Sequence, residues 1–234
     1  SLLQFANDFK QWCKELSNNE ILKVIYQKYG THYMAVENTF KRLCKNYGSM
    51  KVITPNEDKI LDKTNNGGLQ SFNEKFANMT INSFGYDFSA NFPTILQMDT
   101  MLIPTCEPIE TILKELPKRK NIKLGIYHVK ITSNDKQFNH IFAFSHDHYY
   151  TSISLKYALK HRRQFNVKIE LVNDNKTNAY IYDEYVTGRS VFGEWYDKLI
   201  KIKKLYPKNK LVKHLLSSVW GMITHRSIIN KTYD

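Results

Sequence analysis

The sequence contains few of the residues that cross-link small extracellular domains or bind structural metals. Its three cysteines, Cys13, Cys44 and Cys106, lie far apart and form no CxxC pair, so neither a disulfide framework nor a zinc site is predicted. A chain of 234 residues can bury one large or two small hydrophobic cores without such cross-links. We therefore expect the protein to reside in a reducing intracellular compartment, which could be the cytoplasm, a mitochondrion or a virion.

Long apolar segments are also missing. No uninterrupted apolar run reaches the length of about 18 residues that a membrane-spanning helix needs, and residues 1–4 do not have the basic start of a signal peptide. Internal repeats and low-complexity tracts do not occur either. These absences predict a soluble protein with no membrane partner.

Positive charge is abundant and unevenly distributed. The formal net charge is +12, which favours a polyanionic partner, either nucleic acid or an anionic membrane surface. Between Arg189 and Lys231 there are ten Lys or Arg residues and two acids, so this segment alone contributes +8. A solvated, lysine-rich surface helix is the simpler interpretation of such a segment, and a motif within it favours a binding role.

Hydrophobic periodicity separates helical from strand-like parts of the chain. Apolar residues recur at helical spacing in residues 1–47, where two or three helices are predicted. After Gly188 the helical pattern returns, and Pro207 separates two further helices. The elements predicted between these parts are strands at 81–88, 124–132 and 138–145, a helix at 152–165 and a hairpin at 167–182.

This order of elements predicts an α+β fold with strands in the middle and basic helices at the end. Turn-forming residues are concentrated between residues 48 and 68, which indicates a boundary there. We therefore predict an N-terminal helical region at 1–63, a strand-containing domain at 64–188 and basic helices at 189–234.

The first candidate site is the sequence YDFSANFP at residues 86–93. A strand is expected to end at Asp87 and a helix to begin at Pro93, because proline lacks an N–H group that would be unpaired in the first helical turn. Such a junction holds a carboxylate at a strand tip and turns backbone N–H groups toward a metal-bound triphosphate. Taken alone, an aspartate before a loop is more often a helix cap or part of a surface turn.

The second candidate site is the sequence KLVKHLLSSVWG at residues 210–221. On a helix, Lys210, Lys213, Ser217 and Gly221 share one face, while the apolar residues of the sequence share the other. A lysine on the polar face can neutralise phosphate oxygens during phosphoryl transfer, and Gly221 permits close approach of a base pair.

These two sequences resemble motifs of one enzyme family. Residues 87–93 resemble the D-x-x-S-L-Y-P motif of family B DNA polymerases, and residues 213–221 resemble their K-x-x-x-N-S-x-Y-G motif. Gly67 and Gly68 precede the first motif, as a Y-x-G-G segment does in the protein-primed polymerases of small phages and linear plasmids. Ala90 and Asn91 stand where the family has Ser-Leu, Ser217 replaces Asn, and Trp220 replaces Tyr.

The resemblance implies the palm and helical fingers of a DNA-directed DNA polymerase, with an antiparallel sheet flanked by helices. It implies that Asp87 is a ligand of two catalytic Mg²⁺ ions, that Phe92 packs under the deoxyribose and that Lys213 binds the triphosphate. Template-primer DNA, deoxynucleoside triphosphates and a priming terminal protein are the implied partners. The implied nucleotide-binding residues are Phe88, Ser89, Ala90, Asn91, Phe92, Lys210, Lys213, Ser217 and Gly221, and the implied DNA-binding residues are Gly67, Gly68, Arg189 and Trp220.

The family's third motif, Y-x-D-T-D, has no counterpart after Gly221 in these residues. With one acid in place of two, a pair of divalent ions about 4 Å apart would lose a bridging ligand. We therefore expect that the chain alone does not polymerise DNA. The second catalytic aspartate is expected on a downstream segment of a longer chain or on a second polypeptide.

Two other hypotheses remain open at this point. A non-catalytic DNA-binding or virion structural protein derived from a polymerase would keep the basic surface without the chemistry. A peripheral membrane protein would need exposed apolar residues on a basic helix, for which residues 195–206 are the candidate. His146 and His148 could be metal ligands at alternate strand positions, but they lack a nearby third ligand in the sequence.

Overall fold

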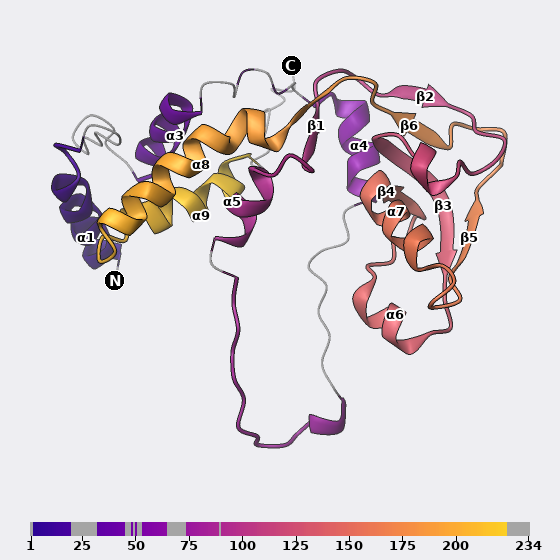
Figure 1. Cartoon of the computed structure of the whole chain (residues 1–234), viewed down its shortest axis with the longest axis horizontal. Helices are drawn as coiled ribbons and strands as arrows, with labels where there is room; N and C mark the ends of the chain where they lie inside the picture. Colours follow the sequence, from indigo (N-terminus) through magenta and orange to yellow (C-terminus); the bar gives the residue numbers. More distant parts are fainter. Residues whose placement is uncertain are drawn as a thin grey trace, which may run out of the picture. The chain divides into compact units, whose positions relative to one another are not determined.

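The computed structural model describes residues 2–19, 32–44, 48, 50, 53–64, 74–88 and 90–223. Over these residues the protein has a mixed α+β structure with eight α-helices and antiparallel strand pairing (Figure 1), which confirms the α+β part of the predicted fold class. The chain forms two compact units. Unit 1 comprises Ser1–Met50, Tyr86–Ile103 and Val186–Asp234, and unit 2 comprises Lys51–Gly85 and Pro104–Tyr185.

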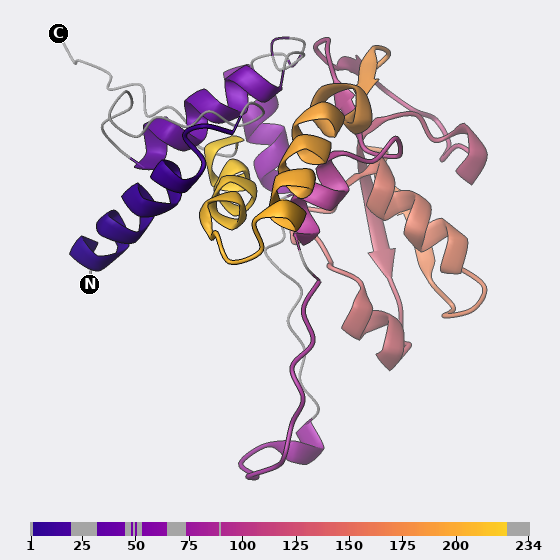
Figure 2. The same cartoon turned by 60° about the vertical axis from the view of Figure 1, so that its left-hand side comes forward.

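Unit 1 is helical in its described part, and its central element is the last helix, α9. Helix α9 packs against each of the other four helices of the unit. Figure 2 shows α9 (yellow) between α8 (orange) and the two N-terminal helices (indigo to purple). The helices of unit 1 are α1 (Leu2–Glu15), α3 (His32–Leu43), α5 (Asn91–Leu96), α8 (Gly188–Leu205) and α9 (Leu211–Ile223).

The core of unit 1 consists of the apolar faces of these amphipathic helices. Phe9 of α1, Phe40 of α3 and Trp195 of α8 are buried in one hydrophobic cluster with residues of α9, as expected where apolar residues repeat at helical spacing. The predictions of at least two helices within residues 1–47 and of two helices separated by Pro207 are confirmed.

Unit 2 contains a five-stranded antiparallel sheet centred on β3. On one side, Ile126 of β3 faces Thr151 of β4. On the other, β6 and β5 pair with successive parts of β3, which places Ala179 opposite Tyr127 and Ile169 opposite Ile131. The strands are β2 (Ile109–Thr111), β3 (Gly125–Thr132), β4 (Tyr149–Thr151), β5 (Lys168–Leu171) and β6 (Ala179–Ile181).

Side chains alternate across β3, as the period of two in a strand requires. Tyr127, Val129 and Ile131 point into a hydrophobic core. That core includes residues of α6 (Lys136–Ile141) and of α7 (Ser152–His161), the helix that contacts β3 and β4 (Figure 1). The predicted strand at 124–132 and the predicted helix beginning at Ser152 are confirmed.

Two predictions for unit 2 are wrong. The segment 138–145 is not a strand, because residues 136–141 form α6. The Asp135 side chain accepts a hydrogen bond of 2.9 Å from the Phe138 backbone N–H, and Phe138 stacks on Phe142 one turn later. The hairpin expected at 167–182 is also absent. Its two strands, β5 and β6, do not pair with each other, and each pairs with β3 instead.

Helix α4 (Pro55–Lys63) was not predicted, since it lies within the segment assigned to a boundary. Its start has recognisable features, with Thr54 as the N-cap, proline in the first turn, and the Thr54 hydroxyl accepting from the Glu57 N–H. The buried Glu57 carboxylate accepts a 2.6 Å hydrogen bond from the Tyr182 hydroxyl, which ties α4 to the sheet-containing part of unit 2.

The compact units do not follow the predicted segments along the chain. The predicted segments 1–63 and 189–234 both supply helices to unit 1, while 64–188 supplies α5 to unit 1 and all the strands of the large sheet to unit 2. A separate two-stranded sheet pairs β1 (Leu102–Pro104) with β7 (Tyr185–Thr187).

Most of the segment that suggested a peripheral membrane protein faces the protein core. Trp195, Leu199 and Ile202 are buried in the core of unit 1, whereas Leu205 and Tyr206 at its end are 61% and 38% exposed, so it offers only a small apolar surface to lipid. Among the helices in the described ranges, none combines the length and the apolar character needed to cross a membrane.

Candidate functional site

Some of the predicted site residues lie outside the described residues. These are Gly67, Gly68 and Ser89. Trp220 lies within α9, but only its backbone is described. The remaining predicted site residues all belong to unit 1.

Asp87 lies in an extended segment that is not part of a sheet. The predicted strand 81–88 is wrong, since no residue of this segment pairs with another strand in the described part of the chain. The neighbouring rings of Phe84, Tyr86 and Phe88 are 87%, 94% and 81% exposed. Alternating apolar residues favour a strand only when a partner edge and a core face are available, and the described residues supply neither to this segment.

Ala90 turns this extended segment into α5. Its backbone has φ of 55° and ψ of 40°, a left-handed conformation that costs a residue with a Cβ about 1–2 kcal/mol relative to the right-handed one. Helix α5 then begins at Asn91, and Pro93 lies in its first turn as predicted. The candidate sugar-discriminating residue, Phe92, is half-exposed in the same turn.

Helix α5 is held against α8 by one polar contact and one close backbone approach. The hydroxyl groups of Thr94 and Tyr196 lie 3.1 Å apart. At Gly188 the first residue of α8 approaches α5 so closely that an added Cβ would lie 2.0 Å from the Leu96 carbonyl oxygen. The Gly188 N–H also donates a 2.6 Å hydrogen bond to the carbonyl oxygen of Met101.

The two predicted faces of α9 are confirmed. Lys210, just before the helix, and Lys213, Ser217 and Gly221 within it are exposed. The residues predicted to form the core face, Val212, Leu215, Leu216 and Val219, are all 3% exposed or less. Because α5 packs on α9, the structure brings the helices of the two sequence motifs together, although the motifs are far apart in the chain.

Lys210 and Lys213 line one cavity of about 470 Å³. His214 and the aromatic side chains of Phe5 and Trp12 from α1 also line it, whereas Asp87 does not. Within the described part of the chain neither lysine forms an ion pair. No carboxylate of the described residues is therefore paired with these ammonium groups in place of an anion from solution.

Arg189, predicted to contact DNA, is engaged within the protein. Its guanidinium group forms a two-pronged ion pair with the Asp197 carboxylate, at 3.2 and 2.5 Å, and donates a 2.8 Å hydrogen bond to Gln97. The interaction with Asp197 raises the pKa of Arg189 above its ordinary value. A DNA phosphate would have to compete with this carboxylate for the guanidinium group.

The residues present do not complete a site for two Mg²⁺ ions. Asp87 supplies one exposed carboxylate, and the described residues contain no group of three or more His, Cys, Asp or Glu side chains that could hold a metal ion. His146 lies in a turn followed by His148, not in a strand, so the two residues do not present adjacent ligands on a sheet. A two-ion site would need a further carboxylate beyond those placed here.

No protein-family model, curated protein or solved structure matches the chain significantly. The assignment of a function therefore depends on the two motifs and on the geometry of unit 1.

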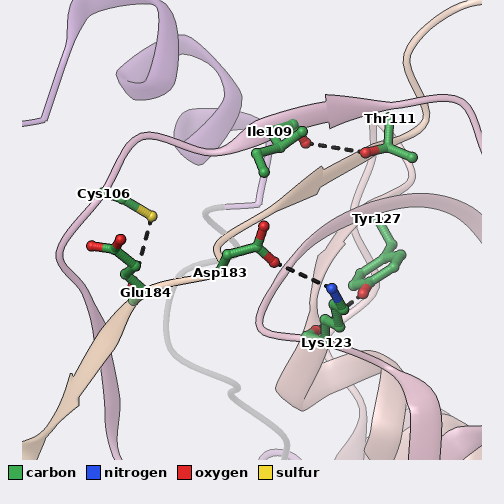
Figure 3. Close-up of polar contacts among 7 residues, drawn as sticks. All are labelled: Cys106, Ile109, Thr111, Lys123, Tyr127, Asp183 and Glu184. Carbon is green, nitrogen blue, oxygen red and sulfur yellow. Dashed lines mark hydrogen bonds and ion pairs between the residues drawn. The ribbon is translucent and has the colours of Figure 1, made fainter.

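Several acidic and thiol groups elsewhere are hydrogen-bonded, ion-paired or buried within their own unit. In unit 2, Asp183 forms a 3.2 Å ion pair with Lys123, whose carbonyl oxygen accepts from the Tyr127 hydroxyl, and the Cys106 thiol donates to the Glu184 carbonyl oxygen (Figure 3). In unit 1, burial raises the pKa of both Cys13 and Cys44 to about 12. Thiols with so high a pKa are poor nucleophiles at neutral pH.

Residues of α1 near the lysines were missed by sequence analysis. Trp12 stacks on His214 with ring centroids 5.4 Å apart, and Asn209 donates hydrogen bonds to the Trp12 carbonyl oxygen and to the Glu15 carboxylate. Gln4, Phe5, Asp8 and Trp12 do recur at helical spacing, but such spacing alone indicates an ordinary packing face and not a cavity.

Proposed function

We propose that the chain is the palm and fingers portion of a family B DNA polymerase of the protein-primed type. Its function would be to add deoxynucleotides during DNA replication, with template-primer DNA and a priming terminal protein as partners. The sequence motifs around Asp87 and Lys213 motivate this proposal. The observation that supports it best is the direct packing of α5 on α9, since a nucleotide site built from these motifs requires their helices to be neighbours.

The roles of individual residues follow from their chemistry. Lys213, assisted by Lys210, would neutralise the phosphate oxygens of the incoming deoxynucleotide. Phe92 would pack under the deoxyribose, and Ser217 and Gly221 would lie along the nascent base pair. The exposure of Lys210, Lys213, Ser217 and Gly221 is consistent with these roles, because each must be accessible to the substrate.

Asp87 would be one ligand of the catalytic Mg²⁺ ions, which in such enzymes activate the attacking hydroxyl and stabilise the leaving group. Since the described residues do not complete a two-ion site, the proposal requires a second acid from outside them. The proposal therefore includes either a downstream part of a longer chain or a separate subunit that carries the second aspartate.

A non-catalytic, polymerase-derived DNA-binding or virion structural protein is the second candidate. One observation favours it. Asp87 lies on an exposed extended segment without, among the described residues, the acids of a complete metal site, whereas Lys201 and Lys204 of α8 and Lys213 of α9 are exposed. Both candidates bind DNA, and they differ in whether a nucleotide affects that binding.

A ternary-complex measurement separates the two candidates. Fluorescence anisotropy would report binding to a template-primer whose primer ends in a dideoxynucleotide, with Mg²⁺ present. For a polymerase, the deoxynucleotide complementary to the next template base is expected to tighten DNA binding about tenfold, or ~1.4 kcal/mol. A non-complementary nucleotide should have little effect, and Lys213→Gln should remove the difference.

The same titration with Lys168→Gln is the control, because Lys168 is an exposed lysine of β5 in unit 2, outside the α9 motif. If complementary and non-complementary nucleotides act alike on the wild-type chain, the polymerase proposal fails and the non-catalytic candidate stands.

A further inference from the structure

The cavity beside Lys213 has walls from two helices that are distant in sequence. Gln4, Phe5, Asp8 and Trp12 line it from α1, and the α9 side supplies Lys210, Lys213 and His214. Its volume of about 470 Å³ lies within the range of about 300–1,000 Å³ that is usual for small-molecule sites.

The position of α1 on α9 is fixed by the side chain of Asn209. This side chain is 7% exposed. Its amide nitrogen donates to the Trp12 carbonyl oxygen at 3.1 Å and to the Glu15 carboxylate at 2.7 Å, and its oxygen accepts from the Leu211 N–H at 2.9 Å. The start of α9 and the aromatic part of α1 are therefore held together by the fold and do not depend on a ligand.

Aromatic rings form part of the wall. Trp12 and His214 are stacked, with an interplanar angle of 18°, and Phe5 meets His214 edge-on at 5.2 Å between ring centroids. Each of the three residues is partly exposed at the cavity. A wall of this kind can pack against a flat aromatic group such as a nucleobase, by stacking on an exposed ring face or by edge-on contact.

The polar groups of the cavity differ in charge. Lys210 and Lys213 provide two ammonium groups without ion-pair partners in the described part of the chain. The Asp8 carboxylate accepts a 2.8 Å hydrogen bond from the Gln4 side-chain amide. Ammonium groups bind phosphate, whereas a carboxylate and an amide bind amino and hydroxyl groups.

We propose that this cavity is a binding site for a nucleoside phosphate that requires neither template nor metal. The base packs against Trp12, His214 and Phe5, and the phosphates contact Lys210 and Lys213. A bare phosphate would leave the aromatic wall unused, and an uncharged aromatic ligand would leave the lysines unused. This proposal rests on the proposed polymerase role in one respect, since Lys213 contacts phosphate in both proposals. It also assigns a role to α1, which contains no residue of the two motifs.

Isothermal titration calorimetry with dATP in EDTA, without DNA, tests this site. The wild-type chain is expected to bind dATP at one site. Trp12→Ala should weaken binding about tenfold through lost stacking, and Lys210→Gln and Lys213→Gln should each weaken it about tenfold through a lost charged contact. Inorganic triphosphate should bind more weakly than dATP and with the same affinity to wild type and Trp12→Ala.

Two variants serve as controls. Trp12→Phe keeps an aromatic ring in the wall and is expected to retain most of the affinity, which separates stacking from a failure to fold. Lys168→Gln removes an exposed lysine of unit 2 that does not line the cavity and should bind dATP like the wild type. Equal affinity of wild type and Trp12→Ala, an equal loss in Trp12→Phe and Trp12→Ala, or no dATP binding at all would overturn the proposal.

The outcomes also distinguish this site from the polymerase proposal. Trp12 lines the cavity and is not part of either polymerase-like motif, whereas Asp87 does not line the cavity, so Asp87→Asn should leave metal-free dATP binding unchanged. Sensitivity to Trp12 without template-dependent nucleotide effects would support the cavity site and count against the polymerase. Template-dependent nucleotide effects without sensitivity to Trp12 would support the polymerase proposal and count against the cavity site.

Discussion

Replacing Gly188 with alanine is expected to lower the free energy of unfolding of unit 1 by about 3 kcal/mol, the upper part of the range for overpacked sites. The added Cβ would lie 2.0 Å from the Leu96 carbonyl oxygen and 3.0 Å from the Met101 Cβ. Because the clash is with backbone, a change of side-chain rotamer cannot relieve it, and α5 must move away from α8.

Tryptophan fluorescence during urea unfolding measures this effect. The three tryptophans, Trp12, Trp195 and Trp220, all belong to unit 1, so their emission reports the unfolding of that unit. This matters because a chain with two compact units need not unfold in a single step.

Gly221→Ala is the matched control for Gly188→Ala. Gly221 lies within α9, and among the described residues no heavy atom beyond its chain neighbours and the local helix backbone lies within 4 Å of the position of its added Cβ. Alanine is more favourable than glycine inside a helix by about 0.5–1 kcal/mol, so this variant should be slightly more stable than wild type. If Gly188→Ala unfolds at the same urea concentration as the wild type, then α5 and α8 do not approach each other as closely as described.

DNA binding is expected to weaken about 100- to 1,000-fold between about 50 and about 200 mM salt, as for a protein that neutralises four or five phosphates. The basic surface responsible comprises exposed lysines of α8, of α9 and of the turn between them. None of these lysines forms an ion pair within the described residues. They are Lys201, Lys204, Lys208, Lys210 and Lys213.

The combined variant Lys201→Gln, Lys204→Gln and Lys208→Gln identifies this surface. Each lost phosphate contact should reduce the slope of log K against log salt by about 0.9, so the triple variant should lose about 2 to 3. A control with the same loss of charge replaces Lys136, Lys168 and Lys176, which are exposed residues of unit 2. An equal loss of slope in both triple variants would mean that DNA binding is not localised on α8 and α9.

Local patterns in the sequence predicted helices better than strands. The two faces of α9 were predictable because a period of 3.6 residues separates its lysines from its leucines. The strand expected at 138–145 failed because its apolar residues Phe138 and Phe142 also fit helical spacing, and the Asp135 cap decided for the helix. For the segment 81–88, the pattern was that of a strand, but strand formation depends on a partner that no local pattern reveals.

The residues of the candidate site could be predicted from the sequence, but the contribution of α1 next to them could not. The motifs identified Asp87 and Lys213, and the packing of α5 on α9 agrees with their association. The contribution of α1 depends on a contact between Asn209 and Trp12, which are almost at opposite ends of the chain. Such contacts are set by tertiary packing, so the cavity could not be derived from spacing along the sequence.

The central claim is that Asp87 and Lys213 act on the same nucleotide, and a double-mutant cycle tests it most directly. The affinity for the complementary deoxynucleotide, with template-primer DNA and Mg²⁺, would be measured for wild type, Asp87→Asn, Lys213→Gln and the double variant. Two groups that contact one ligand should be coupled by about 1 kcal/mol or more. Effects that add to within about 0.3 kcal/mol would contradict the claim, because they are what independent sites produce.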